Sequence, residues 1–202
     1  MSGLPILMEA SGLRVLVVGG GAVATRKAKQ FTQAGAAVRL VAPTLDEDLE
    51  QLVVARGLVV ERRPYESTDI GDAQLIVAAT DNRIVNAGIA RDADAASRLL
   101  NGADHSDDGN FAMMAVHRRG PLTIGVSAGG VPAAAVRIRD ALAERFDARY
   151  GDALTDLSAL RKRLIAAGEV HRWREKSPEL IDAEFCDAVE SGQLSARIAE
   201  WP

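Results

Sequence analysis

The sequence predicts an α/β protein: a Rossmann-type parallel sheet, then a small α+β dimerisation region and a C-terminal helical region. Up to about residue 103, short apolar runs rich in β-branched residues alternate with helical segments, the pattern of a parallel sheet with crossover helices. A glycine-rich turn joins the first run to the first helix. Strand signals end before residue 152. The expected domains are therefore residues 1–110, 111–150 and 151–202.

The first strand and the helix after it are predicted from one continuous stretch. Val15–Val18 is apolar, β-branched in three of its four positions and uncharged, which suits a strand buried on both faces. Three glycines end this run. Apolar residues then recur at helical spacing, at Ala24, Ala28 and Phe31.

The turn between them matches the Gly-x-Gly-x-x-Gly/Ala pattern at Gly19, Gly21 and Ala24. The first glycine permits a tight turn, the second lets the backbone approach a pyrophosphate, and the alanine keeps the helix close to the strand. Ala22 and Val23 follow the turn, where free amides at a helix start point at an anion. Because a strand precedes the pattern and a helix follows it, the stretch predicts a bound dinucleotide.

Polar residues follow the later strands of the predicted sheet. The remaining strands are expected at Ala37–Ala42, Leu58–Glu61, Ala73–Ala79 and Arg98–Ala103, with helices over Asp46–Ala55 and Ile84–Ala96. Ligands of such sheets bind outside the carboxyl ends of the strands. The residues expected there, besides the glycines, are Pro43, Thr44, Thr80, Asp81 and Asp104.

The end of the second strand leaves the choice of cofactor open. An acid usually stands there to bond the adenosine ribose of NAD. This chain has Pro43 and Thr44, and its nearest acid is Asp46. An arginine for the 2′-phosphate of NADP is also missing, unless Arg39 reaches it. The Thr44 hydroxyl and nearby amides are the alternative ribose ligands.

After residue 110 the pattern changes to a predicted hairpin. Phe111–His117 and Leu122–Ser127 are the expected strands, Arg118–Pro121 the turn, and Ala133–Phe146 a following helix. A hairpin with one helix is a poor fold by itself. We therefore expect it to pair with its twin in a homodimer, which would bury the unpaired edges.

Composition limits the partners and the compartment. A net charge of −4 argues against a general nucleic-acid partner. No apolar run reaches the ~18 residues of a membrane span, so no membrane partner is expected. The single cysteine, Cys186, fits a reducing compartment and therefore the cytoplasm. No Cys/His spacing indicates a resident metal site.

Several motifs, taken in order, resemble those of one family. They are Leu4–Ile6, Val17–Ala24 with Arg26–Ala28, Val41–Pro43, Ala78–Asn82 with Asn86, Arg119–Ile124, and Ser127–Gly130. The chain resembles the precorrin-2 dehydrogenase/sirohydrochlorin ferrochelatase family, which includes the N-terminal region of siroheme synthases, in its stand-alone form. Members of that family also lack the ribose acid and have the Ala-Pro turn.

The resemblance implies an NAD-dependent oxidation of precorrin-2 to sirohydrochlorin in siroheme or modified tetrapyrrole biosynthesis. It also implies insertion of Fe²⁺ or Co²⁺ into sirohydrochlorin as a further activity, which some members lack. The family's aspartate at the end of the fifth strand corresponds to Asp104, and a carboxylate there can accept the proton lost from the substrate. Eight substrate carboxylates call for arginines; the candidates are Arg118, Arg119, Arg137, Arg139 and the basic segment 161–176.

Two departures keep other functions open. Ala128 replaces a serine that the family commonly has, and the following turn is one residue shorter at Val131 and Pro132. One alternative is a non-catalytic dinucleotide-binding relative that regulates or partners another tetrapyrrole enzyme. A second, from the glycine motif alone, is an unrelated small NAD(P)-dependent reductase or a nucleotide-sensing module. Asp104 favours the enzyme, because a pure binding module has no chemical need for it.

Overall fold

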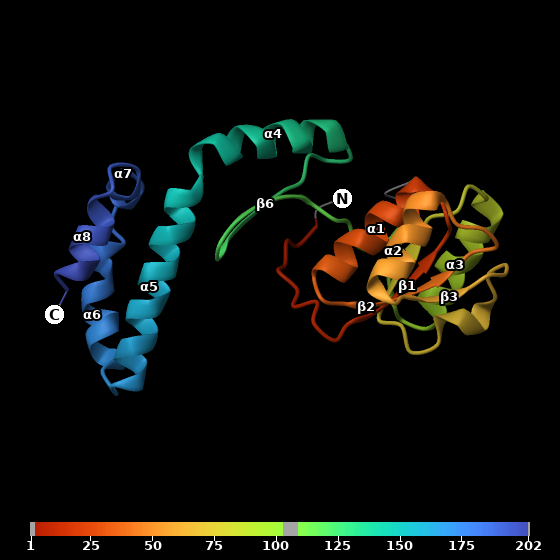
Figure 1. Ribbon diagram of the computed structural model, residues 1–202, viewed down its shortest axis with the longest axis horizontal. Helices are drawn as coiled ribbons and strands as arrows, with labels where there is room; N and C mark the ends of the chain where they lie inside the picture. The colour runs from red at the N-terminus through yellow and green to blue at the C-terminus, as the bar shows by residue number, and fades with distance from the viewer. Residues whose placement is uncertain (1–2, 103–108, 202) are drawn as a thin grey trace. The chain divides into compact units, whose positions relative to one another are not determined.

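The computed structural model describes residues 3–102 and 109–201. It divides into two compact units, Met1–Met113 and Met114–Pro202 (Figure 1). The first unit contains the parallel sheet, and the second contains a hairpin followed by helices only.

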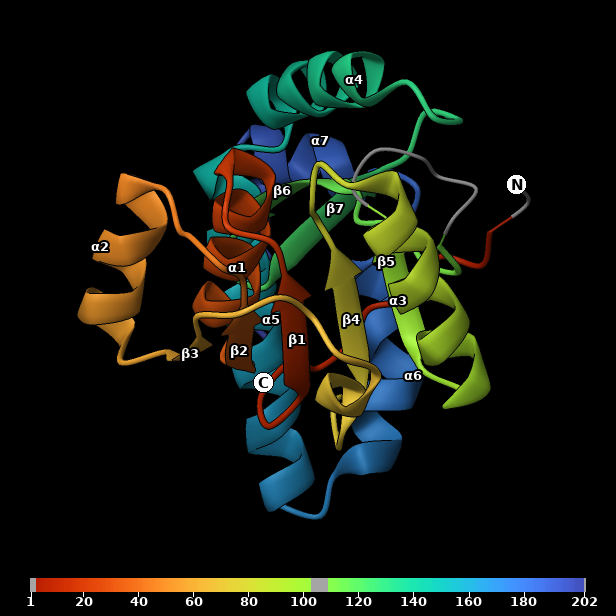
Figure 2. The same ribbon diagram turned by 90° about the vertical axis from the view of Figure 1, so that its right-hand side faces the viewer.

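The first unit is built on a five-stranded sheet in the order β3-β2-β1-β4-β5 (Figure 2). All four neighbouring pairs are parallel, which confirms the predicted sheet. The strands are β1 (Arg14–Val18), β2 (Ala37–Val41), β3 (Val59–Glu61), β4 (Leu75–Ala78) and β5 (Leu99–Gly102). The chain runs outward from β1 to β3 and then returns to the other side of β1, so the strand order reverses between β1 and β4.

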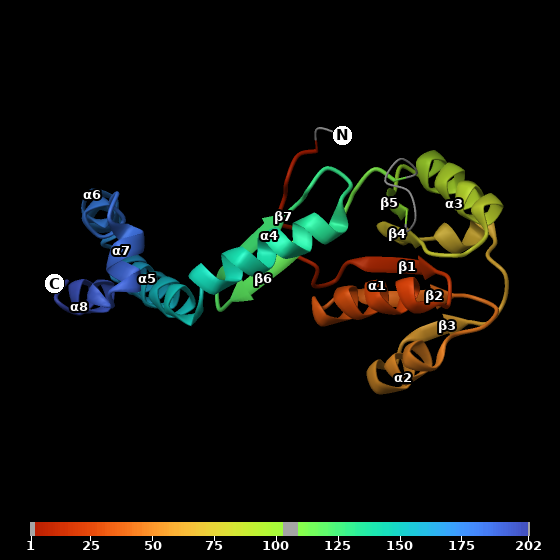
Figure 3. The ribbon, with the colours of Figure 1, turned by 90° about the horizontal axis from the view of Figure 1, so that it is seen from above.

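Helices cover both faces of this sheet (Figure 3). The helices α1 (Ala22–Gln33) and α2 (Glu47–Arg56) pack on one face, against Val15 and Val17. The helix α3 (Arg83–Ala95) and the short 3-10 helix η1 (Ser67–Ile70) pack on the other, against Leu16 and Val18. Alternate β1 side chains therefore enter two different cores, which is why the whole run is apolar.

The edge strand β5 is hydrogen-bonded to Asn110, a residue of the segment that leads to the hairpin. Asn110 donates its backbone N–H to the Leu100 carbonyl at 3.0 Å. Its side-chain oxygen accepts the Leu100 N–H at 2.8 Å. Phe111 and Met113 then pack into the core beneath α1. The expectation that Phe111 opens the hairpin is therefore wrong, because its side chain completes the core of the first unit.

The hairpin consists of β6 (Ala115–Arg119) and β7 (Leu122–Val126), joined by Gly120 and Pro121. The predicted turn of Arg118–Pro121 is too long, since Arg118 and Arg119 belong to the strand. Gly120 has a φ of +50°, which a glycine adopts without strain and which suits the first position of a two-residue turn. The helix α4 (Pro132–Arg145) packs on both strands.

The rest of the second unit is helical, as predicted. The helices are α5 (Ala148–Ala166), α6 (Val170–Leu180), α7 (Phe185–Glu190) and α8 (Gln193–Ala199). The position after residue 150, where a helical tail is expected to begin, lies inside α5. The Tyr150 hydroxyl donates to Glu190 Oε1 at 2.7 Å and ties α5 to α7. Across residues 3–102 and 109–201, no helix combines the length and apolarity that a membrane span requires.

A buried carboxylate joins η1 to the segment that follows β3. Asp69 is 4% exposed, and its Oδ2 accepts from Arg63 Nη1 at 2.9 Å and from the Glu66 N–H at 2.8 Å. Arg39, on β2, pairs with Glu61 Oε1 at 3.2 Å and lies 3.8 Å from Asp69 Oδ1. The Arg63 hydrogen bond holds the pKa of Asp69 below its ordinary value of 3.8.

Replacing Asp69 with asparagine should lower the free energy of unfolding at pH 7 by about 3 kcal/mol, because two guanidinium groups lose their buried partner. Because its pKa is lower in the folded than in the unfolded protein, the Asp69 carboxylate stabilises the folded state above about pH 4. This stabilisation is lost as the pH falls through the pKa of the folded state, because the unfolded carboxyl takes up a proton first. Urea unfolding at pH 7 and pH 3 should therefore show a smaller loss of stability on acidification in Asp69→Asn than in the wild type. Asp72→Asn, at a side chain 77% exposed, is the control; equal losses in wild type and Asp69→Asn contradict the prediction.

Candidate functional site

The turns that follow β1, β2 and β4 touch one another through their backbones. A Cβ placed on Gly19 would lie 2.1 Å from the Ala79 carbonyl oxygen. One placed on Gly20 would lie 1.8 Å from the Thr44 carbonyl oxygen. The structure thus brings together the predicted residues at three strand ends, at the place where the strand order reverses. Ligands of open parallel sheets bind at this switch point.

The third glycine has a different environment. Gly21 is the N-cap of α1, with a φ of −94°, and a Cβ placed on it would meet no atom of the described residues within 4 Å. The first helical hydrogen bond runs from the Thr25 N–H to the Gly21 carbonyl, so the amides of Ala22 and Val23 have no partner within the helix. No side chain of the described residues caps α1, and its first turn carries no acid. The helix start can therefore receive an anion.

Positive charge lies one turn further along α1, at Arg26 and Lys27. Partial burial of the Lys27 ammonium, with Arg26 beside it, lowers its pKa to about 8. Lys27 is still mainly protonated at pH 7, and both side chains make this end of α1 favourable for a phosphate.

Asp46, the acid nearest to the end of β2, is engaged in contacts within the protein. Its Oδ1 accepts the Leu49 N–H at 2.8 Å, as the N-cap of α2, and the Thr25 hydroxyl at 3.0 Å. Its own N–H donates to the Gly20 carbonyl at 2.7 Å. This carboxylate therefore fixes the glycine turn against α2. Pro43 and Thr44 are exposed and precede Asp46 in the chain. They remain the candidate ligand-binding residues at the end of β2.

Arg39 is engaged elsewhere too. It belongs to the ion-pair cluster with Glu61 and Asp69 described above, on the opposite face of the sheet from α1. The possibility that it reaches a 2′-phosphate is therefore removed.

The turn after β4 is held by an asparagine to which the sequence alone gave no role. Asn86, in the first turns of α3, accepts the Thr80 hydroxyl at 2.7 Å and donates to the Thr80 carbonyl at 2.9 Å. Asn82 caps α3 by accepting the N–H groups of Ile84 and Val85. Asp81 lies between Thr80 and Asn82 in the chain and is exposed.

The end of β5 carries a buried amide. Asn101 is 5% exposed, and its Nδ2 donates to the Phe111 carbonyl at 3.0 Å. Its Oδ1 has no hydrogen-bond partner in the part of the chain that the structure describes. Asp104, the predicted catalytic residue, lies outside the described residues.

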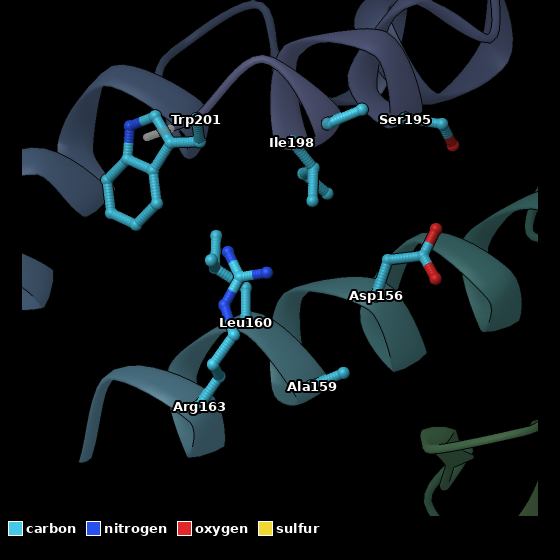
Figure 4. A pocket seen from close by; sticks show the side chains of 8 residues that line it. Asp156, Ala159, Leu160, Arg163, Ser195, Ile198 and Trp201 are labelled. Atoms are coloured by element: carbon cyan, nitrogen blue, oxygen red, sulfur yellow. The ribbon is translucent and has the colours of Figure 1, made fainter. Parts of the chain in front are cut away.

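A separate groove of about 400 Å³ lies in the second unit, between α5 and α8 (Figure 4). Arg163, Leu160 and Asp156 border it from α5, and Ile198 and Trp201 from the other side. Among the basic candidates for carboxylate binding, Arg163 thus borders a hollow. Three others are already paired with acids, namely Arg139 with Asp140, Arg172 with Glu169, and Lys176 with Glu179.

One known family is similar to the first unit of this protein, and several known proteins are similar to nearly the whole chain. A family described as "Putative NAD(P)-binding" matches residues 6–115, which contain the glycine turn and all five strands. The siroheme synthase of Saccharophagus degradans is 34% identical over 202 aligned residues, and that of Pseudomonas putida 38% over 199. The structure of SirC, a precorrin-2 dehydrogenase, matches with a TM-score of 0.76 and 30% identity, covering 98% of this chain and 100% of that one.

The chain belongs to the precorrin-2 dehydrogenase family. The likeness to SirC over its full length confirms the predicted α/β fold with its helical C-terminal region. The NAD(P)-binding match confirms the dinucleotide cofactor expected from the glycine pattern. The two siroheme synthases are longer proteins: the matched regions are 43% and 41% of their lengths, so this chain spans about two fifths of these relatives.

Proposed function

We propose that this protein catalyses the NAD-dependent oxidation of precorrin-2 to sirohydrochlorin in siroheme biosynthesis. The observation that carries the proposal is a glycine turn at the strand switch point, in a chain similar to a precorrin-2 dehydrogenase over its full length. The residues present fit the cofactor. The space beside Gly21 and the two amides at the start of α1 match the needs of a pyrophosphate.

The cofactor contacts follow from the order of the strands. Gly19 and Gly21 shape the turn at the pyrophosphate, and the amides of Ala22 and Val23 bind its oxygens. Pro43 and Thr44, at the end of β2, contact the adenosine ribose. Thr80 and Asp81, at the end of β4, contact the nicotinamide half. With no free arginine at the end of β2 among the described residues, we propose NAD rather than NADP.

The reaction removes a hydride and a proton from precorrin-2. NAD⁺ accepts the hydride when bound. We propose that Asp104 accepts the proton as the general base, because the proton leaves from a different atom than the hydride and a carboxylate positioned beside that atom can take it up. The same carboxylate is suited to receive pyrrole protons if Fe²⁺ or Co²⁺ is inserted as a substrate.

The test is anaerobic incubation of the purified protein with precorrin-2 and NAD⁺, following NADH and sirohydrochlorin by absorbance. Protein-dependent formation of both, in equal amounts, is the expected result. Addition of Fe²⁺ or Co²⁺ then tests metal insertion. NAD⁺ binding without turnover would contradict the activity and favour a regulatory relative that partners another enzyme.

We also propose that the protein is a homodimer joined through the hairpin and α4. Apart from Ala135, no residue of α4 is buried among the described residues, and Val136 and Ile138 are 39% and 49% exposed. A second copy, placed by two-fold symmetry, would cover these side chains and the free edges of the hairpin. The single cysteine supports the cytoplasm as the compartment.

Replacing Ile138 with aspartate should convert the dimer to a monomer, because a carboxylate cannot be buried there without a partner. Sedimentation velocity of wild type and Ile138→Asp measures the change. Ile165→Asp, at a residue 42% exposed on α5, is the control and should stay dimeric. A wild-type protein that is monomeric at micromolar concentration would contradict the proposal.

A further inference from the structure

The two polar hydrogens of Thr80, on its hydroxyl and its backbone nitrogen, are both directed at acceptors inside the β4–α3 turn. The Thr80 hydroxyl has one hydrogen, which faces Asn86 Oδ1 at 2.7 Å and the Asn82 carbonyl at 3.1 Å. The Thr80 N–H also points to Asn86 Oδ1, at 3.3 Å. A hydroxyl oxygen accepts two hydrogen bonds, and one of these comes from the Asn82 N–H at 3.2 Å. Within residues 3–102 and 109–201, one lone pair of Thr80 Oγ1 has no donor and is left for a ligand.

The orientation of the Asn86 amide follows from the same contacts. Its oxygen meets an N–H and an O–H of Thr80, and its nitrogen meets the Thr80 carbonyl at 2.9 Å. A flipped amide would set its N–H groups against the Thr80 N–H and its oxygen against a carbonyl. The donor direction at Thr80 is therefore fixed by Asn86.

The position of this turn decides which half of the cofactor it faces. The pyrophosphate lies at the start of α1, directly after β1, and the adenosine ribose lies toward β2. The strand β4 pairs with β1 on the side opposite to β2. The turn after β4 therefore faces the nicotinamide riboside half.

We propose that Asn86 is a positioning residue that makes Thr80 an acceptor only, reserved for a donor on the nicotinamide riboside half of the dinucleotide. The donor is a ribose hydroxyl or the N–H of the carboxamide; a phosphate oxygen, which only accepts, is refused there. The inference rests on the proposed function for the presence of a dinucleotide, but it does not depend on the identity of the second substrate.

The experiment compares the binding of NAD⁺ and of ADP, which lacks the nicotinamide riboside, by calorimetry without a second substrate. Thr80→Val removes the acceptor, and Asn86→Leu removes the group that orients it. Both should weaken NAD⁺ binding about tenfold and leave ADP binding unchanged, since one hydrogen bond is lost at one half only. Thr80→Ser keeps the hydroxyl and should bind NAD⁺ like the wild type.

The matched control is Thr32→Val, the same chemical change at the far end of α1, where the hydroxyl donates to the helix carbonyls of Ala28 and Lys29. Thermal unfolding of each ligand-free variant distinguishes the loss of one ligand contact from a general loss of folding. A general loss of folding would weaken the binding of NAD⁺ and of ADP equally. Unchanged NAD⁺ binding in Thr80→Val, or an equal loss for both ligands in a folded variant, overturns the inference. NAD⁺ binding with the expected pattern but no oxidation of precorrin-2 overturns the proposed activity alone.

Discussion

Alanine at Gly19 is expected to lower the free energy of unfolding by about 3 kcal/mol or more and to abolish dinucleotide binding. Gly19 has a φ of +129°, a conformation that alanine rarely adopts, and the added Cβ would lie 2.1 Å from the Ala79 carbonyl oxygen. Relief requires β1 and β4 to separate at their carboxyl ends, because the obstacle is backbone rather than a flexible side chain.

Gly21→Ala is the matched control, since it places the same methyl group two residues further along. Gly21 has a negative φ and an open Cβ direction, so the ligand-free protein should unfold at the same urea concentration as the wild type. NAD⁺ binding should nevertheless weaken, because the methyl group occupies space proposed for the pyrophosphate. Urea unfolding and NAD⁺ titration of both variants measure this. A Gly19→Ala protein as stable as wild type would contradict the close contact of the two turns.

Replacing Asp104 with asparagine is expected to lower kcat for precorrin-2 oxidation about 100-fold while the affinity for NAD⁺ stays the same. Asparagine has a similar shape but cannot take a proton, and loss of a general base costs roughly two to four powers of ten in rate. Anaerobic initial rates over a range of NAD⁺ concentrations separate kcat from KM.

Asp107→Asn and Asp108→Asn remove a carboxylate from the same segment and serve as controls for a general change of charge. They should keep nearly full activity. Wild-type kcat in Asp104→Asn would remove this residue from the mechanism without affecting the cofactor site, whereas equal losses in all three variants would point to the charge of the segment.

The sequence by itself determined the parallel sheet and the place of the glycine turn between its first strand and first helix. Val15–Val18 has no polar position because both faces of β1 are covered by helices. A short, uncharged run of this kind predicts a strand buried on both faces. The pattern from Gly19 to Ala24 likewise specifies a local geometry, a tight turn followed by a helix, that depends on neighbouring residues only. Local patterns of this kind can be interpreted before any long-range contact is known.

Only the tertiary structure decided what the polar residues around that turn do. The sequence showed Asp46 as the acid nearest to the end of β2 and left Arg39 open as a phosphate ligand, but Asp46 caps α2 and Arg39 pairs with acids on the opposite face. It assigned Phe111 to the hairpin, whereas this ring completes the core of the first unit. Asn86 acquired its role only through its contact with Thr80. A polar side chain takes its partner from whatever the fold brings within hydrogen-bond distance, and residue type and spacing do not specify that partner.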